Sequence, residues 1–142
     1  GSISSGFAQY WTRDDSTYVV SDSGSNGCSG PNSVKFMPNN TNEVHLFAEE
    51  LTVDSSKTYT WNTCVKAGTG SGEFGFYIDE LDADGNWTSG QWLGAVDLGK
   101  DAVYSLAYKP TSSKVKSIGL QYYKDKNSTF TVYVDEVYFD VK

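Results

Sequence analysis

The chain has 142 residues, 38% of them hydrophobic and 20% charged, and its formal net charge at pH 7 is −7. That length suits one domain, so we expect residues 1–142 to be a single module, with Gly1-Ser2 resembling a cloning remnant. The negative charge disfavours nucleic acids and acidic membrane surfaces as partners. Apolar runs are too short for a transmembrane span and no signal peptide is visible, so we expect an excised module.

Aromatic residues make up 15% of the chain, as ten Tyr, seven Phe and four Trp in a background rich in Ser, Thr, Gly and Asn. Aromatic and β-branched side chains suit a pleated sheet, and strong helix formers are scarce here. The composition therefore predicts a β protein.

Alternation of apolar and polar residues predicts the strands in chain order. The strand at 58–66 turns Tyr59, Trp61, Thr63 and Val65 to one face. The complete set of expected strands is 33–37, 43–47, 58–66, 73–81, 87–96, 103–108, 115–123 and 130–141, with a short early strand near Tyr18. About ten short strands with regular turns predict one all-β sandwich or barrel.

Several aromatic residues share the apolar phase of their strands, and we expect them in the core: Phe36, Trp61, Phe74, Phe76 and Phe139. Trp11 is expected to close one end of the sandwich. Asp84-Gly85-Asn86 predicts a hairpin turn, because Gly and Asn tolerate positive φ.

Few groups point to catalysis. His45 is the only histidine, which excludes a multi-histidine metal site, and we expect it to be either a surface residue or an edge-strand residue. Four acidic residues precede the hairpin, and we expect them to serve the turn and its solvation: Asp79, Glu80, Asp82 and Asp84. Their spacing is not that of an EF-hand loop.

The cysteines and one late carboxylate leave alternatives open. Cys28 and Cys64 are either a disulfide that joins a loop to a strand or two unpaired thiols. Asp135 interrupts an apolar alternation near the end of the chain. It is either a ligand of a cation or a strand-end carboxylate that faces solvent.

A second group of aromatic and amide residues is out of phase with the core. The outward residues are Tyr77 and Asp79 on one strand, Gln121 and Tyr123 on another, Gln91 on the hairpin's return strand, and Tyr18. An aromatic ring stacks on the apolar face of a pyranose, while Gln and Asp side chains bind its hydroxyls. This row of outward aromatic, amide and carboxylate side chains therefore indicates a binding site for a sugar chain.

Five motifs occur in a familiar order: Gly6-Phe7 with Trp11, Gly30–Phe36, Lys57–Ala67, Asp84–Trp92 and Tyr133–Val137. Together they resemble carbohydrate-binding modules of the group that contains families 4, 9, 16 and 22. The hairpin that ends in Ser-Gly-Gln-Trp is most similar to family 16.

The resemblance implies a jelly roll of two antiparallel sheets with no catalytic activity. It implies that a concave groove holds β-1,4-linked gluco- or manno-oligosaccharides, or a related plant cell-wall polysaccharide. Tyr18 is then the early stacking platform and Tyr123 the late one, while Asp79 and Gln91 bind hydroxyls. Such modules are appended to secreted polysaccharide-degrading enzymes, so a linked catalytic domain and an extracellular location are expected.

Many members of this group also hold a structural calcium ion through the Asp of the terminal motif, which is Asp135 here. The Glu that commonly follows Gly-Phe is replaced by Ala8. Two other functions fit a chain of this composition: a small jelly-roll glycosidase or lyase, and an adhesion module without a sugar groove.

Overall fold

The computed structural model describes residues 11–142, in which the alternating pattern produces eleven strands. They are β1 (Trp11–Arg13), β2 (Val19–Asp22), β3 (Ser33–Phe36), β4 (Val44–Ala48), β5 (Leu51–Thr52), β6 (Tyr59–Ala67), β7 (Phe74–Leu81), β8 (Trp87–Ala95), β9 (Asp101–Tyr108), β10 (Ser117–Lys124) and β11 (Val132–Val141). Within this range no helix is long and apolar enough to cross a membrane.

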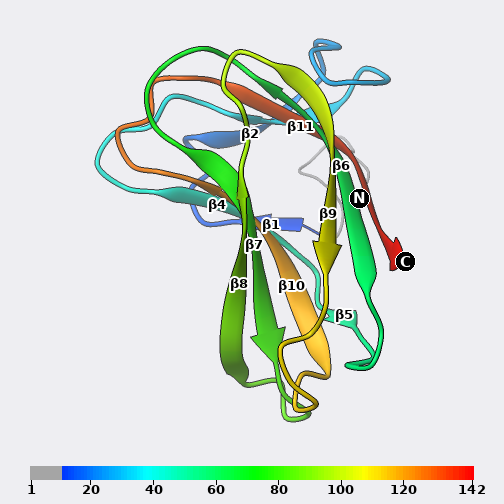
Figure 1. Ribbon diagram of the computed structural model, residues 1–142. Coiled ribbons are helices and arrows are strands. Elements are labelled where there is room, and N and C mark those ends of the chain that lie inside the picture. The colour runs from blue at the N-terminus through cyan, green and yellow to red at the C-terminus, as the bar shows by residue number, and fades with distance from the viewer. Residues whose placement is uncertain (1–10) are drawn as a thin grey trace.

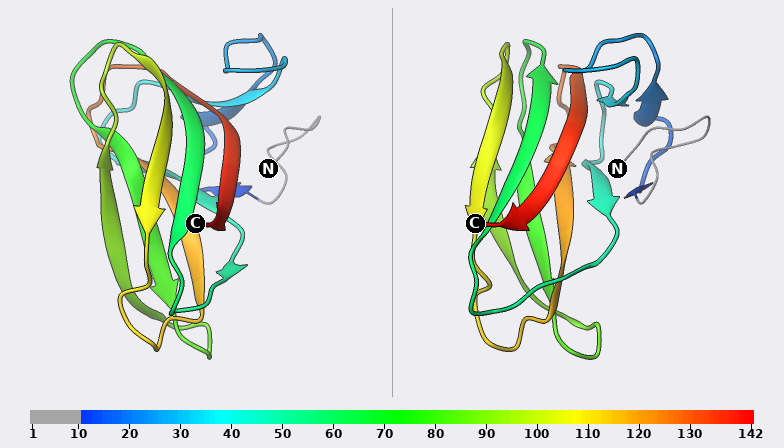
Figure 2. Two further views of the ribbon diagram at one scale, coloured as in Figure 1. Left: turned by 45° about the vertical axis from the view of Figure 1, so that its right-hand side comes forward. Right: turned by 90° about the vertical axis from the view of Figure 1, so that its right-hand side faces the viewer.

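The strands form two antiparallel sheets that pack as two layers (Figure 1). The front sheet has the order β1-β4-β10-β7-β8, and β5 pairs with β10 beyond the end of β4. The back sheet has the order β2-β3-β11-β6-β9, and Figure 2 shows β9, β6 and β11 side by side in this layer. The predicted all-β sandwich is therefore confirmed.

The core between the sheets is built largely from aromatic rings. Tyr122 of β10 lies among Trp61, Phe74 and Phe76, with ring centroids 5.2, 6.0 and 5.8 Å away. Its hydroxyl is hydrogen-bonded to Thr63 Oγ1 at 2.7 Å, which satisfies the polar end of a fully buried ring. The predicted inward face of β6 is confirmed.

The predicted core residues Phe36, Trp61, Phe74 and Phe76 are all fully buried. Phe139 is only partly buried and stacks on Tyr59 at 5.1 Å. Trp11 is also partly buried, and it packs on Tyr122 from edge strand β1. Its contact therefore lies along a sheet edge, whereas the sequence predicted an end of the sandwich.

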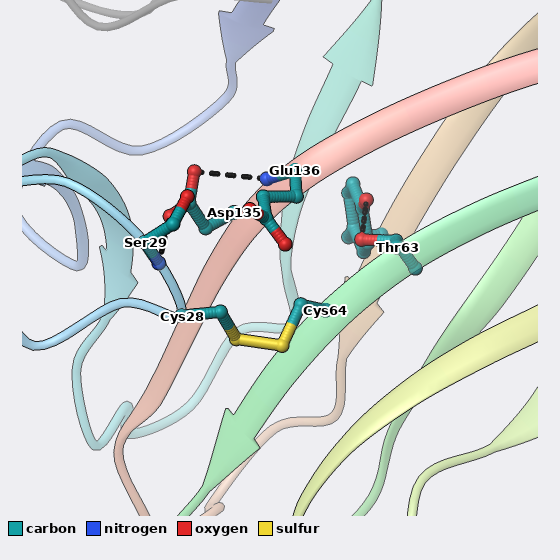
Figure 3. Close-up of a disulfide and its surroundings, with 7 residues drawn as sticks. Cys28, Ser29, Thr63, Cys64, Asp135 and Glu136 are labelled. Carbon is teal, nitrogen blue, oxygen red and sulfur yellow. Dashed lines mark hydrogen bonds between the residues drawn. A yellow bond between two sulfur atoms is a disulfide. The ribbon is translucent and has the colours of Figure 1, made fainter.

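A disulfide joins Cys28 to Cys64, so the first of the two alternatives for the cysteines is correct (Figure 3). Cys64 follows the inward-facing Thr63 on β6 and lies on the outer side of the back sheet. The bond thus fastens the loop between β2 and β3 to that outer face. Asp135 adds a second attachment, because its Oδ2 accepts a hydrogen bond from the Ser29 N–H at 3.1 Å.

The sequence prediction for Glu80 is wrong, because its carboxylate is fully buried. It accepts hydrogen bonds from Tyr108 Oη at 2.6 Å, Thr111 Oγ1 at 2.7 Å, Thr111 N at 3.0 Å and Ser89 Oγ at 2.9 Å. A buried carboxylate is tolerated when several donors surround it. Glu80 therefore ties β7 to β8 and to the chain that follows β9.

Asp82 behaves as predicted, since its Oδ1 accepts hydrogen bonds from the backbone N–H groups of Asp84 at 2.9 Å and Asn86 at 3.0 Å. These contacts close the hairpin between β7 and β8, and Gly85 takes a positive φ of 78° there.

Candidate functional site

The outer face of the front sheet collects aromatic and amide side chains from four neighbouring strands. Its central row crosses the sheet from Phe47 on β4 to Gln121 on β10, Tyr77 on β7 and Trp92 on β8, which are partners in register. The neighbouring strands β4, β10, β7 and β8 can be followed in Figure 1. Side chains opposite one another in register lie close enough to form a continuous surface.

A hollow of about 330 Å³ lies on this face, and we call it the front hollow. Its lining residues are Glu43, His45, Glu73, Tyr77, Trp92, Gln121 and Tyr123. The Tyr123 ring lies 6.0 Å from Trp92 in an edge-to-face arrangement and 5.5 Å from His45. Three of the residues predicted to bind ligand, Tyr77, Gln121 and Tyr123, are thus brought together.

Two glycines allow aromatic rings to pack closely against the backbone of the sheet. A Cβ at Gly75 would overlap the Trp92 ring, and a Cβ at Gly90 would overlap the hydroxyl and ring of Tyr77. The rings are therefore supported by the neighbouring strand. Trp92 nevertheless stays 45% exposed, so its indole has surface available to a ligand.

Tyr123 keeps its phenol protonated. Burial raises the pKa of Tyr123, and the nearby Asp125 and Glu43 carboxylates raise it further. Its hydroxyl donates to Asp125 Oδ1 at 3.0 Å. The group is therefore a neutral ring with a fixed hydroxyl, suited to stacking as well as hydrogen bonding.

His45 lies in an interior strand, because β4 pairs with both β1 and β10, so the edge-strand alternative is wrong. The surface alternative holds, since His45 is partly exposed and lines the front hollow. Its Nδ1 lies 2.6 Å from Asp14 Oδ2, and its Nε2 lies 3.7 Å from Glu43 Oε1. The ring also stacks on Phe47 at 5.5 Å. His45 is therefore held in one orientation in the wall of the hollow.

Asp79 extends the same face along β7, two residues beyond Tyr77. Burial raises the pKa of Asp79, while a hydrogen bond from Trp87 Nε1 at 3.1 Å opposes that effect. Trp87 is 60% exposed. Asp79 and Trp87 therefore present a carboxylate and an indole beside the hollow. Asp79 shares the outer face with Tyr77, Gln121 and Tyr123, the three predicted residues that line the hollow.

The structure does not bring Gln91 and Tyr18 into this group. Gln91 is in register with the buried Ile78, and its Nε2 donates to the Lys109 carbonyl at 2.9 Å. Tyr18 directly precedes β2 of the back sheet and packs against the core. Neither lines the front hollow.

Sequence reasoning missed Trp92, Trp87 and His45 as members of this face. Exposed indoles are uncommon on a protein surface, and two of the four tryptophans are exposed here. Trp87 and Trp92 both lie in the Asp84–Trp92 motif, so the motif did point to the correct hairpin but not to the side chains that matter.

Asp135 accepts backbone hydrogen bonds through both carboxylate oxygens, from Ser29 at 3.1 Å and from Glu136 at 2.8 Å. Residues 11–142 contain no group of three or more His, Cys, Asp and Glu side chains that could hold a metal ion. The described side chains therefore do not complete a calcium site, and Ala8 lies outside the described residues. Calcium at Asp135 stays a prediction.

No family model matches the sequence, and no curated protein matches it. Among solved structures, the xylan-binding CBM22-1 domain of Paenibacillus barcinonensis Xyn10C is 18% identical, with a TM-score of 0.71 over 99% of this chain and 90% of that one. A family 16 carbohydrate-binding module is 16% identical, with a TM-score of 0.63 over 96% and 97%.

The CBM22-1–GH10 structure of Clostridium thermocellum Xyn10B, complexed with xylohexaose, is 18% identical with a TM-score of 0.70. That match covers 93% of this chain but only 26% of the longer xylanase chain. Identities this low establish the fold alone. The chain has the β-jelly-roll fold of carbohydrate-binding modules, as its resemblance to family 16 implied.

Proposed function

We propose that the front face binds a polysaccharide chain without cleaving it. The observation that carries this proposal is the exposed Trp92 indole, which shares one hollow with Tyr77, Tyr123 and the Gln121 amide. Exposed rings beside a small number of polar groups are typical of saccharide sites.

The energetics suit weak, reversible binding. Covering roughly 100 Å² of apolar sugar surface on a ring contributes about 2–3 kcal/mol. Gln121, Asp79 and the Tyr123 hydroxyl then pair with equatorial hydroxyls. Because association and ordering cost free energy, we expect dissociation constants in the micromolar to millimolar range.

We propose a β-1,4-linked gluco- or manno-oligosaccharide, or a related plant cell-wall polysaccharide, as the ligand. The structural neighbours support this class, since one is complexed with xylohexaose and another with β-1,4-galactotriose. We further propose that the module tethers a secreted enzyme to its substrate, because the Clostridium thermocellum neighbour joins its module to a GH10 module. Tethering raises the substrate concentration near the enzyme.

Affinity gel electrophoresis with glucans, mannans, xyloglucan and xylan tests the proposal. We expect retardation by at least one polysaccharide, and Trp92→Ala should reduce it. Retardation by none would refute saccharide binding and favour an adhesion module. Release of reducing ends by the isolated chain would favour a glycosidase.

The calcium prediction has its own test. If Asp135 holds a calcium ion, EDTA should lower the Tm of the wild-type chain and leave the Tm of Asp135→Asn unchanged. Equal Tm values with and without EDTA would leave Asp135 as an acceptor for the Ser29 and Glu136 N–H groups only.

A further inference from the structure

The front hollow carries an uneven set of charges. Of the seven residues that line it, Glu43 and Glu73 are acidic and none is Lys or Arg. Asp125 lies against the Tyr123 hydroxyl at 3.0 Å, and Asp79 continues the same face on β7. Four carboxylates therefore surround a group of aromatic rings.

The cations nearest in sequence do not offset these carboxylates. Lys124 is fully buried on the opposite side of β10, where its Nζ donates to Asn39 Oδ1 at 2.6 Å and lies over the Phe130 ring. The exposed Lys126 lies in the turn beyond Asp125 and is not among the lining residues. The His45 ring is flanked by two carboxylates, with Nδ1 2.6 Å from Asp14 Oδ2 and Nε2 3.7 Å from Glu43 Oε1.

We propose that the front hollow selects its saccharide by charge, binding β-linked chains that carry ammonium groups more tightly than neutral chains and rejecting chains that carry carboxylates. The ligand class is a β-1,4-linked polymer of 2-amino-2-deoxyglucose units. This inference rests on the proposed function and specifies the ligand of the same site.

The physical basis has two parts. An ammonium group close to exposed carboxylates such as Glu43 and Glu73 should raise the affinity of the saccharide about fivefold at low salt. The faces of Trp92 and Tyr123 also attract a cation through the ring quadrupole. A uronate carboxylate is repelled by these groups, because the glutamates carry the same negative charge and the ring faces are also negative.

The test compares three hexasaccharides that share the β-1,4 backbone: cellohexaose, the glucosamine hexamer and the N-acetylglucosamine hexamer. Titration calorimetry at about pH 5.5, where the amines are protonated, gives each affinity at about 20 mM and about 300 mM salt. We expect the glucosamine hexamer to bind at least about fivefold more tightly than cellohexaose at low salt. The acetylated hexamer controls for bulk at the same ring carbon and should lack this preference.

Two double variants with the same net charge locate the effect. Glu43→Gln/Glu73→Gln should bring the ratio of glucosamine-hexamer affinity to cellohexaose affinity close to one. Glu49→Gln/Asp101→Asn removes two exposed carboxylates that do not line the hollow and should keep the preference. Equal affinities for the first two hexasaccharides, or equal losses in both variants, would overturn the charge selection. Absence of binding by all three would also overturn the charge selection, whereas the proposed function fails only if the affinity-gel panel shows no retardation by any polysaccharide.

Discussion

The ring of Tyr77 on β7 lies across Gly90 on β8, so closely that a Cβ at Gly90 would overlap the Tyr77 hydroxyl and ring. All three heavy atoms nearest to that Cβ position belong to Tyr77. Gly90 is in register with Asp79, two residues along β7. The absent side chain at 90 therefore sets the height at which the Tyr77 ring rests on the front face.

This contact predicts a coupled effect of two substitutions. Gly90→Ala should displace the Tyr77 ring and lower oligosaccharide affinity, with a loss of about 1–3 kcal/mol in unfolding free energy from overpacking. In a Tyr77→Ala background the same change should cost little, because the overlapping atoms are gone. Urea unfolding and calorimetric titration of all four proteins measure the coupling. Additive effects would show that Gly90 does not position Tyr77.

Trp92 and Gln91 offer a matched pair of neighbours on β8. Trp92→Ala should weaken oligosaccharide binding by about 1–3 kcal/mol, because its exposed indole lines the hollow. Gln91→Ala should leave binding unchanged, since its amide donates to the Lys109 carbonyl. Calorimetric titration of both variants, with an oligosaccharide of the polysaccharide that binds best in the affinity gels, measures the two losses of affinity. A larger loss for Gln91→Ala would restore the assignment made from the sequence.

The fold was predictable because long strands such as β6, β7 and β10 bury one face. All eight strands expected from alternation are present, and their ends differ from the observed ends by at most two residues. The strands that alternation did not reveal are β1 and β5, with three and two residues. Segments this short contain too few residues for a period of two to be recognised.

The site was less predictable because the alternation of inward and outward side chains is interrupted along β8. Its pairing with β7 shifts between Phe76 and Tyr77 and again between Glu80 and Leu81. Each irregularity changes which side chains face outward, so counting in twos from the hairpin turn cannot place Gln91 and Trp92. By contrast, β10 pairs with β7 without interruption, and the outward positions of Gln121 and Tyr123 follow from alternation.

The partners of the buried Glu80 carboxylate were also beyond the pattern. Glu80 shares the inward phase of Phe76 and Ile78 on β7, but its partner Thr111 lies 31 residues away. Only the tertiary arrangement brings Tyr108, Thr111 and Ser89 to the carboxylate. Composition and local spacing contain no sign of such a long-range network.

Glu80→Gln should destabilise the fold by about 2–3 kcal/mol, because the amide group cannot accept all four hydrogen bonds. Burial raises the pKa of Glu80, but the donors Tyr108, Thr111 and Ser89 outweigh it and leave the pKa below its ordinary value of 4.5. The stability from this group is therefore fully present above about pH 4.5 and is lost as pH falls through the folded pKa. Urea unfolding from pH 7 to 3 should show a shallower acid decline for Glu80→Gln than for the wild type; parallel curves would contradict this role.

The disulfide should stabilise the fold without contributing to the binding face. Cys28 and Cys64 are 36 residues apart, and closing such a loop in the unfolded chain is worth about 4 kcal/mol. Cys28→Ser/Cys64→Ser should therefore lower the unfolding free energy by about that amount. Because the bond lies on the back sheet, oligosaccharide affinity at a temperature where the variant is folded should match the wild type. A large loss of affinity would mean that the loop between β2 and β3 communicates with the front hollow.

Lys124 should make the protein more stable in mildly alkaline solution. Burial lowers the pKa of Lys124 to about 8, from an ordinary value of 10.5. Between these two values the unfolded chain binds the proton more tightly than the folded chain, so unfolding free energy rises with pH across this window. The total rise is at most about 3 kcal/mol. The raised pKa of the Tyr122 phenol acts in the opposite direction above about pH 10, where the unfolded state loses that proton first.

Lys124→Met isolates this effect, because it retains the long side chain over Phe130 and removes the titrating group. Urea unfolding at intervals from pH 7 to 10 should show a rise for the wild type and a nearly flat curve for Lys124→Met. Lys114→Met, at an exposed position, should follow the wild type. If the wild type and Lys124→Met change in parallel, the buried ammonium is not the source of the pH dependence.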